Sequence, residues 1–362
     1  MLNTLKRMYN NLNIQQLDNQ ESIRPAMGLF KSSSPPMGTR IVYEPPPETP
    51  VFADICFVHG LGGHREETWT WMGDDSSDES KKSKKNKDHH VFWPEELLPE
   101  TFGDLRIITW GYDSNLKGLA SGKIQSSLYD FGTGLLQDLV DERDEDAMYR
   151  PLFLVGHSLG GLVIQEALVQ SSMSRDDQMK SLFHCTRNVI FMGTPHRGSE
   201  TMDLGQTLIW ATKACLKNPN DQFLNTLKPN SQILSNACQS FGNIAHQFGP
   251  ICFFEELATC IAGFQQVIVE KQSAVLYGFR SVGIPASHTQ MCRFKDKSDV
   301  GYTRFRGELK KKVRDLRKDL KKREEEATGR GLERNEEGQS LLTYEPAEVP
   351  LSSPEDAWGV YS

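Results

Sequence analysis

The sequence predicts an α/β fold in which a mostly parallel central sheet is covered by helices on both faces. Two observations predict this class. Short apolar runs with the length of strands alternate with longer segments of helical periodicity, which is typical of parallel sheets buried on both faces. One such run, 151–155, leads through the residues GHSLG directly into an apolar helical segment at 161–168. A chain of 362 residues is long enough for one large domain with appendages.

Bulk composition excludes several classes of protein. The chain is 38% hydrophobic and 25% charged, which is ordinary for a soluble protein with polar tails. Its formal net charge of −7 gives no reason to expect a nucleic-acid partner. It contains no apolar run long enough to span a membrane, and residues 1–20 lack the apolar core of a secretory signal. The 7 cysteines are odd in number and lack metal-ligand spacing, so we expect a reducing compartment, no disulfide framework and no metal.

The first 50 residues are polar and rich in proline. They predict a disordered or weakly structured lead-in, 1–50, to a domain that spans 51–302. Within that domain, residues 73–90 (GDDSSDESKKSKKNKDHH) predict a disordered, charged surface insertion. A helix is expected over 126–148, where large apolar side chains recur on one side. Strands are expected, in chain order, at 53–58, 105–110, 152–155, 189–192 and 251–254, with two short candidates at 267–269 and 274–276.

The carboxy-terminal part of the chain changes in character. The segment 199–250 is longer than one crossover helix needs, and it predicts either a cap over a functional site or additional packing helices. Residues 303–327 predict a basic amphipathic helix, which can dock on a partner protein or an anionic membrane surface, or remain solvated. Residues 328–362 predict a disordered tail. The apolar stripe of the expected helix consists of Leu309, Val313, Leu316 and Leu320.

The segment Gly156–Gly160 has the pattern G-x-S-x-G between an expected strand and an expected helix. This arrangement is typical of a nucleophile elbow, in which a strained backbone holds a serine hydroxyl at the carboxyl edge of a sheet. The glycines at both ends are needed because bulky side chains there would collide. A short motif also occurs by chance, and the alternative is a glycine-rich turn with an incidental serine. The context of strand and helix favours Ser158 as a nucleophile.

A serine nucleophile needs a base that takes its proton, and in parallel-sheet hydrolases the chain order is serine, acid, histidine. His288 is the last histidine of the sequence and follows the last strand candidates. His184 and His246 precede the strand at 251–254, which is too early. The order of residues therefore favours His288 as the base.

The acid that orients the histidine should follow the strand at 251–254. Both Glu255 and Glu256 do so, and strand alternation allows only one of them to face the site. Glu270 is a third candidate. We favour Glu255 because it ends the strand directly.

Two backbone amides are expected to stabilise the oxyanion that forms in the transition state. One is the amide of Leu159, directly after the nucleophile. The other should come from the glycine-rich turn 58–64, with Leu61 as the first choice and Gly62 as the next. This turn does not fit a dinucleotide site, because Arg65 stands where G-x-G-x-x-G requires its third glycine. No cofactor is therefore expected.

Several segments together carry a family resemblance. They are FVHGLGGHREETWTW, FWPEELLPE, RIITWGYDS, LVGHSLGGLVIQEAL, FMGTPHRGS, FFEELAT, VEKQSAVL and IPASHTQMCRF, in this order between residues 53 and 302. The chain thereby resembles the serine-active-site-containing protein family, a branch of the α/β-hydrolases related to the GPI-inositol-deacylase-like lipases.

The resemblance implies an α/β-hydrolase fold and a lipid or carboxylic-ester substrate. It also implies association with mitochondria or the endoplasmic reticulum, and phospholipid remodelling in some members. It assigns the nucleophile to Ser158, the histidine to His288 and the acid to Glu255. The block GTPHRG is typical of the family, and its His196 is given a turn-stabilising role. The chain differs from the family pattern in lacking a long amino-terminal extension with a membrane span or helical repeats, so a cytoplasmic location is the alternative.

The sequence as a whole predicts a cofactor-independent serine esterase or lipase that works through a Ser-His-Glu triad and an acyl-enzyme. Its expected partners are a lipid or small ester substrate and, through residues 303–327, a membrane surface or a protein. Two alternatives remain open. The same site would act as a transacylase if an alcohol replaced water. A non-catalytic interaction module on a hydrolase fold would use the basic helix, the charged insertion and the tails.

Overall fold

The computed structural model describes residues 36–73, 90–114, 124–143, 147–197, 207, 211, 231–261 and 264–335. The chain forms two compact units, 1–306 and 307–362. The first unit contains the central sheet and all residues of the candidate site. The second begins within the long helix α11 (Val300–Asn335).

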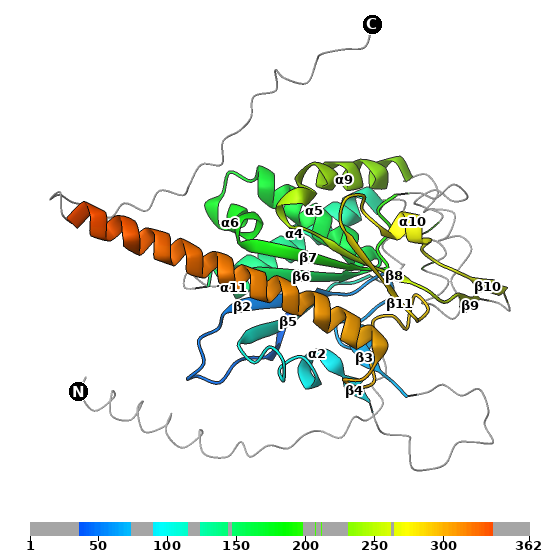
Figure 1. The fold of residues 1–362 in the computed structure, drawn as a ribbon. Helices are drawn as coiled ribbons and strands as arrows, with labels where there is room; N and C mark the ends of the chain where they lie inside the picture. Colours follow the sequence, from blue (N-terminus) through cyan, green and yellow to red (C-terminus); the bar gives the residue numbers. More distant parts are fainter. Residues whose placement is uncertain are drawn as a thin grey trace, which may run out of the picture. The chain divides into compact units, whose positions relative to one another are not determined.

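Seven strands form the central sheet (Figure 1). In spatial order they are β1 (Gly38–Tyr43), β5 (Leu105–Gly111), β2 (Ala53–Val58), β6 (Leu152–His157), β7 (Thr186–Met192), β8 (Ile251–Glu255) and β11 (Arg280–Ile284). All neighbouring pairs are parallel except β1 and β5, which are antiparallel. The mostly parallel sheet predicted from the sequence is confirmed, and the strand–elbow–helix unit at its centre is that of an α/β-hydrolase.

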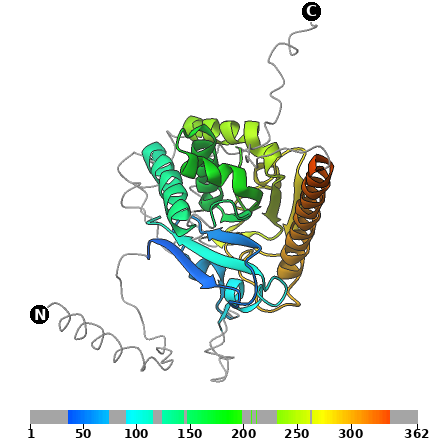
Figure 2. The same ribbon diagram turned by 90° about the vertical axis from the view of Figure 1, so that its left-hand side faces the viewer.

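One face of the sheet is covered by four helices that pack on one another (Figure 2). Side chains of β2, β6 and β7 that point to this face, such as Val58, Leu154 and Phe191, share one apolar core with the helices. Because successive side chains of a strand alternate between faces, each buried strand supplies apolar groups to both layers. The helices are α4 (Ile124–Glu142), α5 (Leu159–Met173), α6 (Asp177–Cys185) and α9 (Ser231–Ile244).

The opposite face is covered by an aromatic cluster. Phe57 of β2 lies 5.1 Å from Trp69 and 5.3 Å from Trp93, measured between ring centroids. Trp93 in turn lies 5.1 Å from Phe305. These rings come from η1 (Glu67–Trp69), α2 (Trp93–Glu96) and the first turns of α11, so helices cover both faces as predicted. Edge contacts between buried rings add about 0.5–1.5 kcal/mol per pair to the burial of their area.

A buried ion-pair cluster lies at the amino end of β2. The Asp54 carboxylate is fully buried and accepts two hydrogen bonds from Arg106, at 2.9 and 3.1 Å. Arg150 donates to the same carboxylate at 3.1 Å, and Arg143 lies 3.5 Å from it. The cluster links β2, β5 and the segment after α4 at the end of the sheet opposite to Ser158, and a buried carboxylate of this kind requires such partners.

Part of the predicted lead-in belongs to the sheet. Within 1–50, residues Gly38–Tyr43 form β1, so the prediction of a disordered or weakly structured lead-in was wrong for this part. The burial of β1 is intermediate or exposed at every position, as suits an edge strand, and its sequence therefore lacks the apolar signal of the central strands. Residues 1–35 lie outside the described part of the chain.

The last strand of the sheet was missed. The candidates at 267–269 and 274–276 are not strands, because the former lies in a loop and Ala274 ends the short helix α10 (Lys271–Ala274). The strand β11 instead occupies Arg280–Ile284 and pairs with β8. The apolar side chains of Ile268 and Val269 are fully buried although their backbone is irregular.

The helix expected over 126–148 is α4, which begins at Ile124 and ends at Glu142. Residues 147–150, which the prediction included in part, form a turn. In the segment 199–250, α9 packs on α5 and is followed by η4 (Ala245–Gln247), with Phe241 and Phe248 in the apolar core. The described part of that segment thus consists of packing helices. Residues 198–206, 208–210 and 212–230, and the insertion residues 74–89, lie outside the described residues.

The helix α11 contains the predicted basic helix 303–327 and extends beyond both of its ends. Asp299 begins it by accepting hydrogen bonds from the amides of Gly301 and Tyr302, which is the role of an N-cap. The prediction of disorder from 328 onward was wrong as far as Asn335, where α11 ends. Residues 336–362 lie outside the described part. In the described chain, no helix has both the length and the apolar character that crossing a membrane requires.

The small hairpins β3 (Thr70–Trp71)–β4 (Val91–Phe92) and β9 (Thr259–Ile261)–β10 (Phe264–Gln266) complete the first unit. The second of these hairpins directly follows β8 and precedes the loop that contacts Glu255.

Candidate active site

Ser158 lies at the sharp turn between β6 and α5. Its backbone has φ 52° and ψ −122°, and it is the one non-glycine residue with positive φ among those described. The packing around the turn leaves no room for a side chain at Gly160, because its Cβ atom would lie 2.3 Å from the carbonyl oxygen of His59. At Gly156 a Cβ atom would lie 2.6 Å from Cα of Gly161. The collision expected on both sides of the serine is therefore real, and the strained backbone is held by close packing.

His288 lies beside the serine. Its Nε2 atom is 3.1 Å from Oγ of Ser158, and both side chains are almost completely buried. The histidine follows β11 in a turn that is closed by the amide of Met291, which donates to the carbonyl of Ser287 at 2.9 Å. The backbone carbonyl of His288 contacts Nε2 of His157 at 3.1 Å. The residue is thus fixed through both its backbone and its ring.

Glu255 is the last residue of β8, and it completes the line of contacts. Its Oε2 atom lies 2.6 Å from Nδ1 of His288. Its Oε1 atom accepts hydrogen bonds from the backbone amides of Ile268 and of Val269, the latter at 3.3 Å. A buried carboxylate requires such partners, and here both of its oxygen atoms have them. The structure thus brings Ser158, His288 and Glu255 together.

The two alternative acids lie elsewhere. Glu256 points to the other side of the strand, where its carboxylate is 3.4 Å from Nη1 of Arg304 and 39% exposed. Glu270 precedes α10, and its Oε2 atom accepts a hydrogen bond from Gln272 at 2.8 Å. Neither carboxylate is brought to His288.

The glycine-rich turn after β2 lies against the elbow. The amide of Gly63 donates to the carbonyl of Gly60 at 3.1 Å, so Leu61 and Gly62 are the central residues of a β-turn. Gly62 has φ 63°, which a glycine adopts without strain. A Cβ atom at Gly60 would lie 3.0 Å from Cβ of Ser158, which measures how closely the turn approaches the serine. The structure therefore brings the Leu61 turn next to Ser158.

The other expected amide, that of Leu159, belongs to the first residue of α5. Amides of a first helical turn lack a carbonyl partner within the helix, and the positive end of the helix dipole reinforces them. The helix therefore presents a donor directly after the serine.

Two buried histidines, His59 and His157, flank this group, and no role for them was predicted from the sequence. His59 stacks on Tyr112 with 4.5 Å between ring centroids, and burial lowers its pKa to about 4. Burial also lowers the pKa of His157 well below its usual range, with the nearby His288 as a second cause. Both rings are therefore neutral at pH 7 and act as hydrogen-bonding groups. Their position inside the motifs VHG and GHS was the signal available in the sequence.

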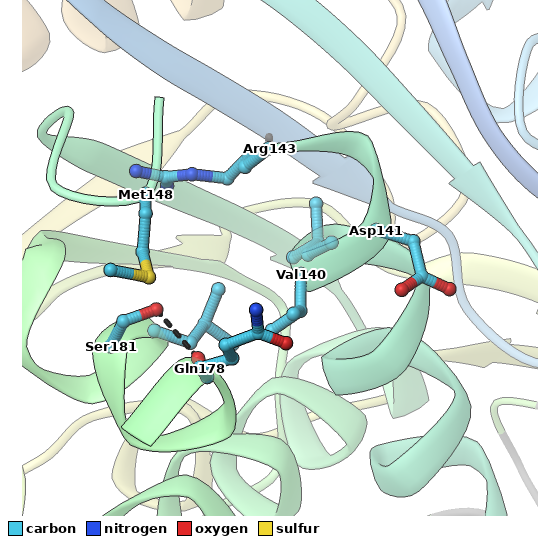
Figure 3. Close-up of a pocket in the computed structure, with 8 residues that line it drawn as sticks. Val140, Asp141, Arg143, Met148, Gln178 and Ser181 are labelled. Carbon is cyan, nitrogen blue, oxygen red and sulfur yellow. Dashed lines mark hydrogen bonds between the residues drawn. The ribbon is translucent and has the colours of Figure 1, made fainter. Parts of the chain in front are cut away.

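A cavity of about 260 Å³ lies apart from these residues (Figure 3). In it, Oγ of Ser181 donates to the backbone carbonyl of Gln178 at 2.6 Å. None of the residues that line it belongs to the Ser158 group. They are Leu139, Val140, Asp141, Arg143, Met148, Gln178, Ser181 and Leu182. In the described parts of the chain, no group of three or more His, Cys, Asp or Glu side chains is placed to hold a metal ion.

The geometry fits nucleophilic chemistry. A hydroxyl, an imidazole and a carboxylate follow one another at hydrogen-bonding distance, in an environment from which water is largely excluded. In such an arrangement a base takes the hydroxyl proton as the oxygen attacks, and the acid holds the base in the correct tautomer.

Sequence comparison gives curated relatives with the name Protein SERAC1. No family model matches the chain. The chain is similar to Protein SERAC1 of Danio rerio, with 26% identity over 262 residues, and to that of Bos taurus, with 27% identity over 260 residues. Each match covers 70% of this chain and 38% of the relative, so the matched part is well under half of the relatives' length. The family resemblance inferred from the sequence is thereby confirmed.

Among solved structures, the chain is similar to a Bacillus licheniformis lipase, BlEst2, at a TM-score of 0.42 and 17% identity. That match covers 72% of this chain and 91% of the lipase. A putative aryl esterase from Burkholderia cenocepacia gives a TM-score of 0.38 and 14% identity, covering 76% of this chain and 93% of the esterase.

Proposed function

We propose that this protein is a serine hydrolase that cleaves a carboxylic ester through an acyl-enzyme. The observation that carries the proposal is the continuous line of contacts from Glu255 through His288 to Ser158, at 2.6 and 3.1 Å. The strained backbone of Ser158 supports it, because strain of this kind persists where the surrounding structure holds it for function.

In the first half of the reaction, Oγ of Ser158 attacks the carbonyl carbon of the ester while Nε2 of His288 takes its proton. The tetrahedral intermediate collapses with cleavage of the bond to the alkoxide, and the imidazolium gives its proton to that leaving group. An alcohol departs, and the acyl group remains on Ser158. Glu255 holds the proton on Nδ1 and stabilises the imidazolium throughout.

The negative charge of each tetrahedral intermediate needs donors. We assign this role to the backbone amides of Leu159 and Leu61, with that of Gly62 as the alternative to the second. Donors of this type contribute about 3–4 kcal/mol each to transition-state stabilisation. The exclusion of water strengthens them, because electrostatic interactions grow as the local dielectric constant falls.

In the second half, water attacks the acyl carbon and gives a proton to His288, and the proton returns to Oγ as the acid leaves. An alcohol acceptor in place of water would give a new ester by the same steps. Hydrolysis and transacylation therefore share one site and are separated by their products.

For the substrate we propose a lipid ester. The family resemblance supports it, and so does the charge of α11. Nine basic and two acidic side chains lie between Lys310 and Arg323, and such a segment is attracted to anionic lipid headgroups. Peripheral contact with an anionic membrane is consistent with the proposed association with mitochondria or the endoplasmic reticulum.

Turnover of esters by the purified chain tests the function. Initial rates on p-nitrophenyl esters of increasing acyl length, and on a phospholipid in vesicles with and without an anionic lipid, should be at least about 1000-fold lower for Ser158→Ala. The matched control is Ser181→Ala, which removes a largely buried serine hydroxyl from the separate cavity and should leave rates unchanged. Equal turnover by Ser158→Ala and wild type would refute the proposal. Adding an alcohol acceptor and comparing free acid with new ester decides between hydrolysis and transfer.

A further inference from the structure

The four residues Thr194–Arg197, which we call the post-β7 turn, lie between the elbow and the loop that binds Glu255. Thr194 lies under the elbow, since a Cβ atom at Gly161 would meet its Oγ1 atom at 2.0 Å. Directly before the turn, a Cβ atom at Gly193 would lie 3.0 Å from the His288 ring. The rest of the turn contacts the loop that binds Glu255.

That loop, residues 267–273, must hold two backbone amides in fixed positions. Its amides at Ile268 and Val269 are the donors to Oε1 of Glu255, yet its first half belongs to no helix or strand. Its own hydrogen bonds are local, from the amides of Ser273 and Ala274 to the carbonyl of Glu270, at 2.8 and 3.0 Å. Such a loop holds its amides at fixed positions only if neighbouring segments anchor it.

The post-β7 turn provides three anchors to two consecutive residues of the loop. The amide of His196 donates to the carbonyl of Ser273 at 2.8 Å. Oγ of Ser273, which is fully buried, donates to the carbonyl of Arg197. Nε of Arg197 donates to the carbonyl of Gln272 at 2.7 Å. The guanidinium of Arg197 also lies 4.2 Å above the ring of Tyr277, which limits its motion.

The turn itself is fixed to the sheet and to α5. Nδ1 of His196 lies 2.8 Å from the side-chain nitrogen Nε2 of Gln165, and Nε2 of His196 lies 3.8 Å from the thiol of Cys252. Gln165 belongs to the helix that follows Ser158, and Cys252 belongs to the strand that ends at Glu255. Burial lowers the pKa of His196 to about 3, so the ring is neutral and keeps these contacts at physiological pH.

We propose that Arg197 and Ser273 are positioning residues for the Glu255–His288 pair, an inference that rests on the proposed function. They fix the loop whose amides hold the Glu255 carboxylate, and the carboxylate in turn holds the imidazole for attack by Ser158. Neither residue touches the reacting atoms. Weakening this clamp therefore lowers the chemical rate constant and leaves substrate binding unchanged.

Steady-state kinetics of Arg197→Ala and Ser273→Ala, combined with hydrogen exchange, test the clamp. We expect kcat to fall about tenfold in each variant while KM stays within twofold, as is common when a supporting partner is lost. Exchange of the Ile268 and Val269 amides should become faster. Arg197→Lys keeps a donor for the carbonyl of Gln272 and should restore most of kcat.

The controls are Arg175→Ala, which removes an exposed arginine, and Ser181→Ala, which removes another buried serine hydroxyl bonded to a carbonyl. Both should leave kcat and amide exchange as in wild type. Unchanged kcat and exchange in the two clamp variants, or a loss that appears in KM, would overturn the inference. Absence of turnover in wild type would instead refute the proposed function, and amide exchange would then still decide whether the clamp holds the loop.

Discussion

At the scale of single residues, the choice between neighbouring glutamates depends on strand geometry. Glu255 and Glu256 are adjacent, and the end of β8 directs their side chains to opposite sides. Glu255 turns inward to His288 and to two backbone amides, whereas Glu256 turns outward to Arg304. The sequence favoured Glu255 from its place at the end of the strand, and the structure brings this carboxylate to His288. The sequence contained no sign of the two amides, because it predicted a strand at 267–269 where the structure has a loop.

Replacing each candidate acid by its amide separates these roles. Glu255→Gln removes the charge that stabilises the imidazolium and the acceptor that fixes its tautomer, so we expect kcat to fall by roughly 10²–10⁴. Glu256→Gln and Glu270→Gln should stay within about twofold of wild type, because neither carboxylate reaches His288. Ester turnover at pH 7.5 measures all three. A Glu255→Gln variant with wild-type kcat would rule out this acid.

At the scale of elements, the site depends on how closely the turn after β2 packs against the start of α5. The carbonyls of Val58 and His59 lie where a side chain at residue 160 would have to go. This close approach places the Leu61 turn beside the first amides of α5. Each of these two elements supplies one proposed oxyanion donor. They can approach this closely because residue 160 is a glycine and has no Cβ atom.

Gly160→Ala tests this packing. The added Cβ atom meets backbone atoms, which cannot move aside as a side chain can, so we expect a loss of more than about 2 kcal/mol in the free energy of unfolding. Ester turnover should fall as the two elements separate. The matched change Gly242→Ala, at an exposed position of α9 with no atom within 4 Å, should be neutral or stabilise by up to about 1 kcal/mol. Urea unfolding of both variants measures the difference, and equal stabilities would contradict this role of Gly160.

The elements that could be predicted from the sequence are those whose burial is complete. The strands β2 and β6 are buried at every position, and their apolar runs were located within two residues. Edge strands present one exposed face, and both β1 and β11 were missed. At Ile268 and Val269 the sequence predicted a strand, and the structure has a loop. Their side chains are buried and hold this loop against Glu255. A short run of apolar residues indicates that the segment is buried. It does not by itself distinguish a buried strand from a loop that is anchored in the core.

At the scale of the whole molecule, the first unit buries several histidines in neutral form. His59 and His196 have pKa values of about 4 and 3, below the ordinary value of 6.5, because burial disfavours the charged ring. The unfolded chain therefore binds more protons than the folded chain between those values and about 6.5. The contribution of these histidines to the free energy of unfolding is fully present above this range and is lost as the pH falls through it.

Unfolding free energies should therefore decrease steeply in mild acid. His59 alone accounts for a loss of about 2 kcal/mol between pH 7 and pH 5. His196→Gln removes one proton-binding site and should flatten the slope near pH 5 by about 1.4 kcal/mol per pH unit. The control is His246→Gln, which removes an exposed histidine and should leave the slope nearly unchanged. Urea unfolding at pH 7.5, 6 and 5 measures the slopes, and a flat pH dependence in wild type would contradict neutral burial.

The central claim is that Ser158 is a nucleophile activated by His288, and covalent labelling tests it most directly. Wild-type protein treated with a fluorophosphonate probe should gain one adduct per chain, and peptide mass analysis should locate it on Ser158. His288→Ala should lose the labelling while its unfolding midpoint remains close to that of wild type. Well-folded wild-type protein that takes up no probe, or takes it up at another residue, would contradict the account.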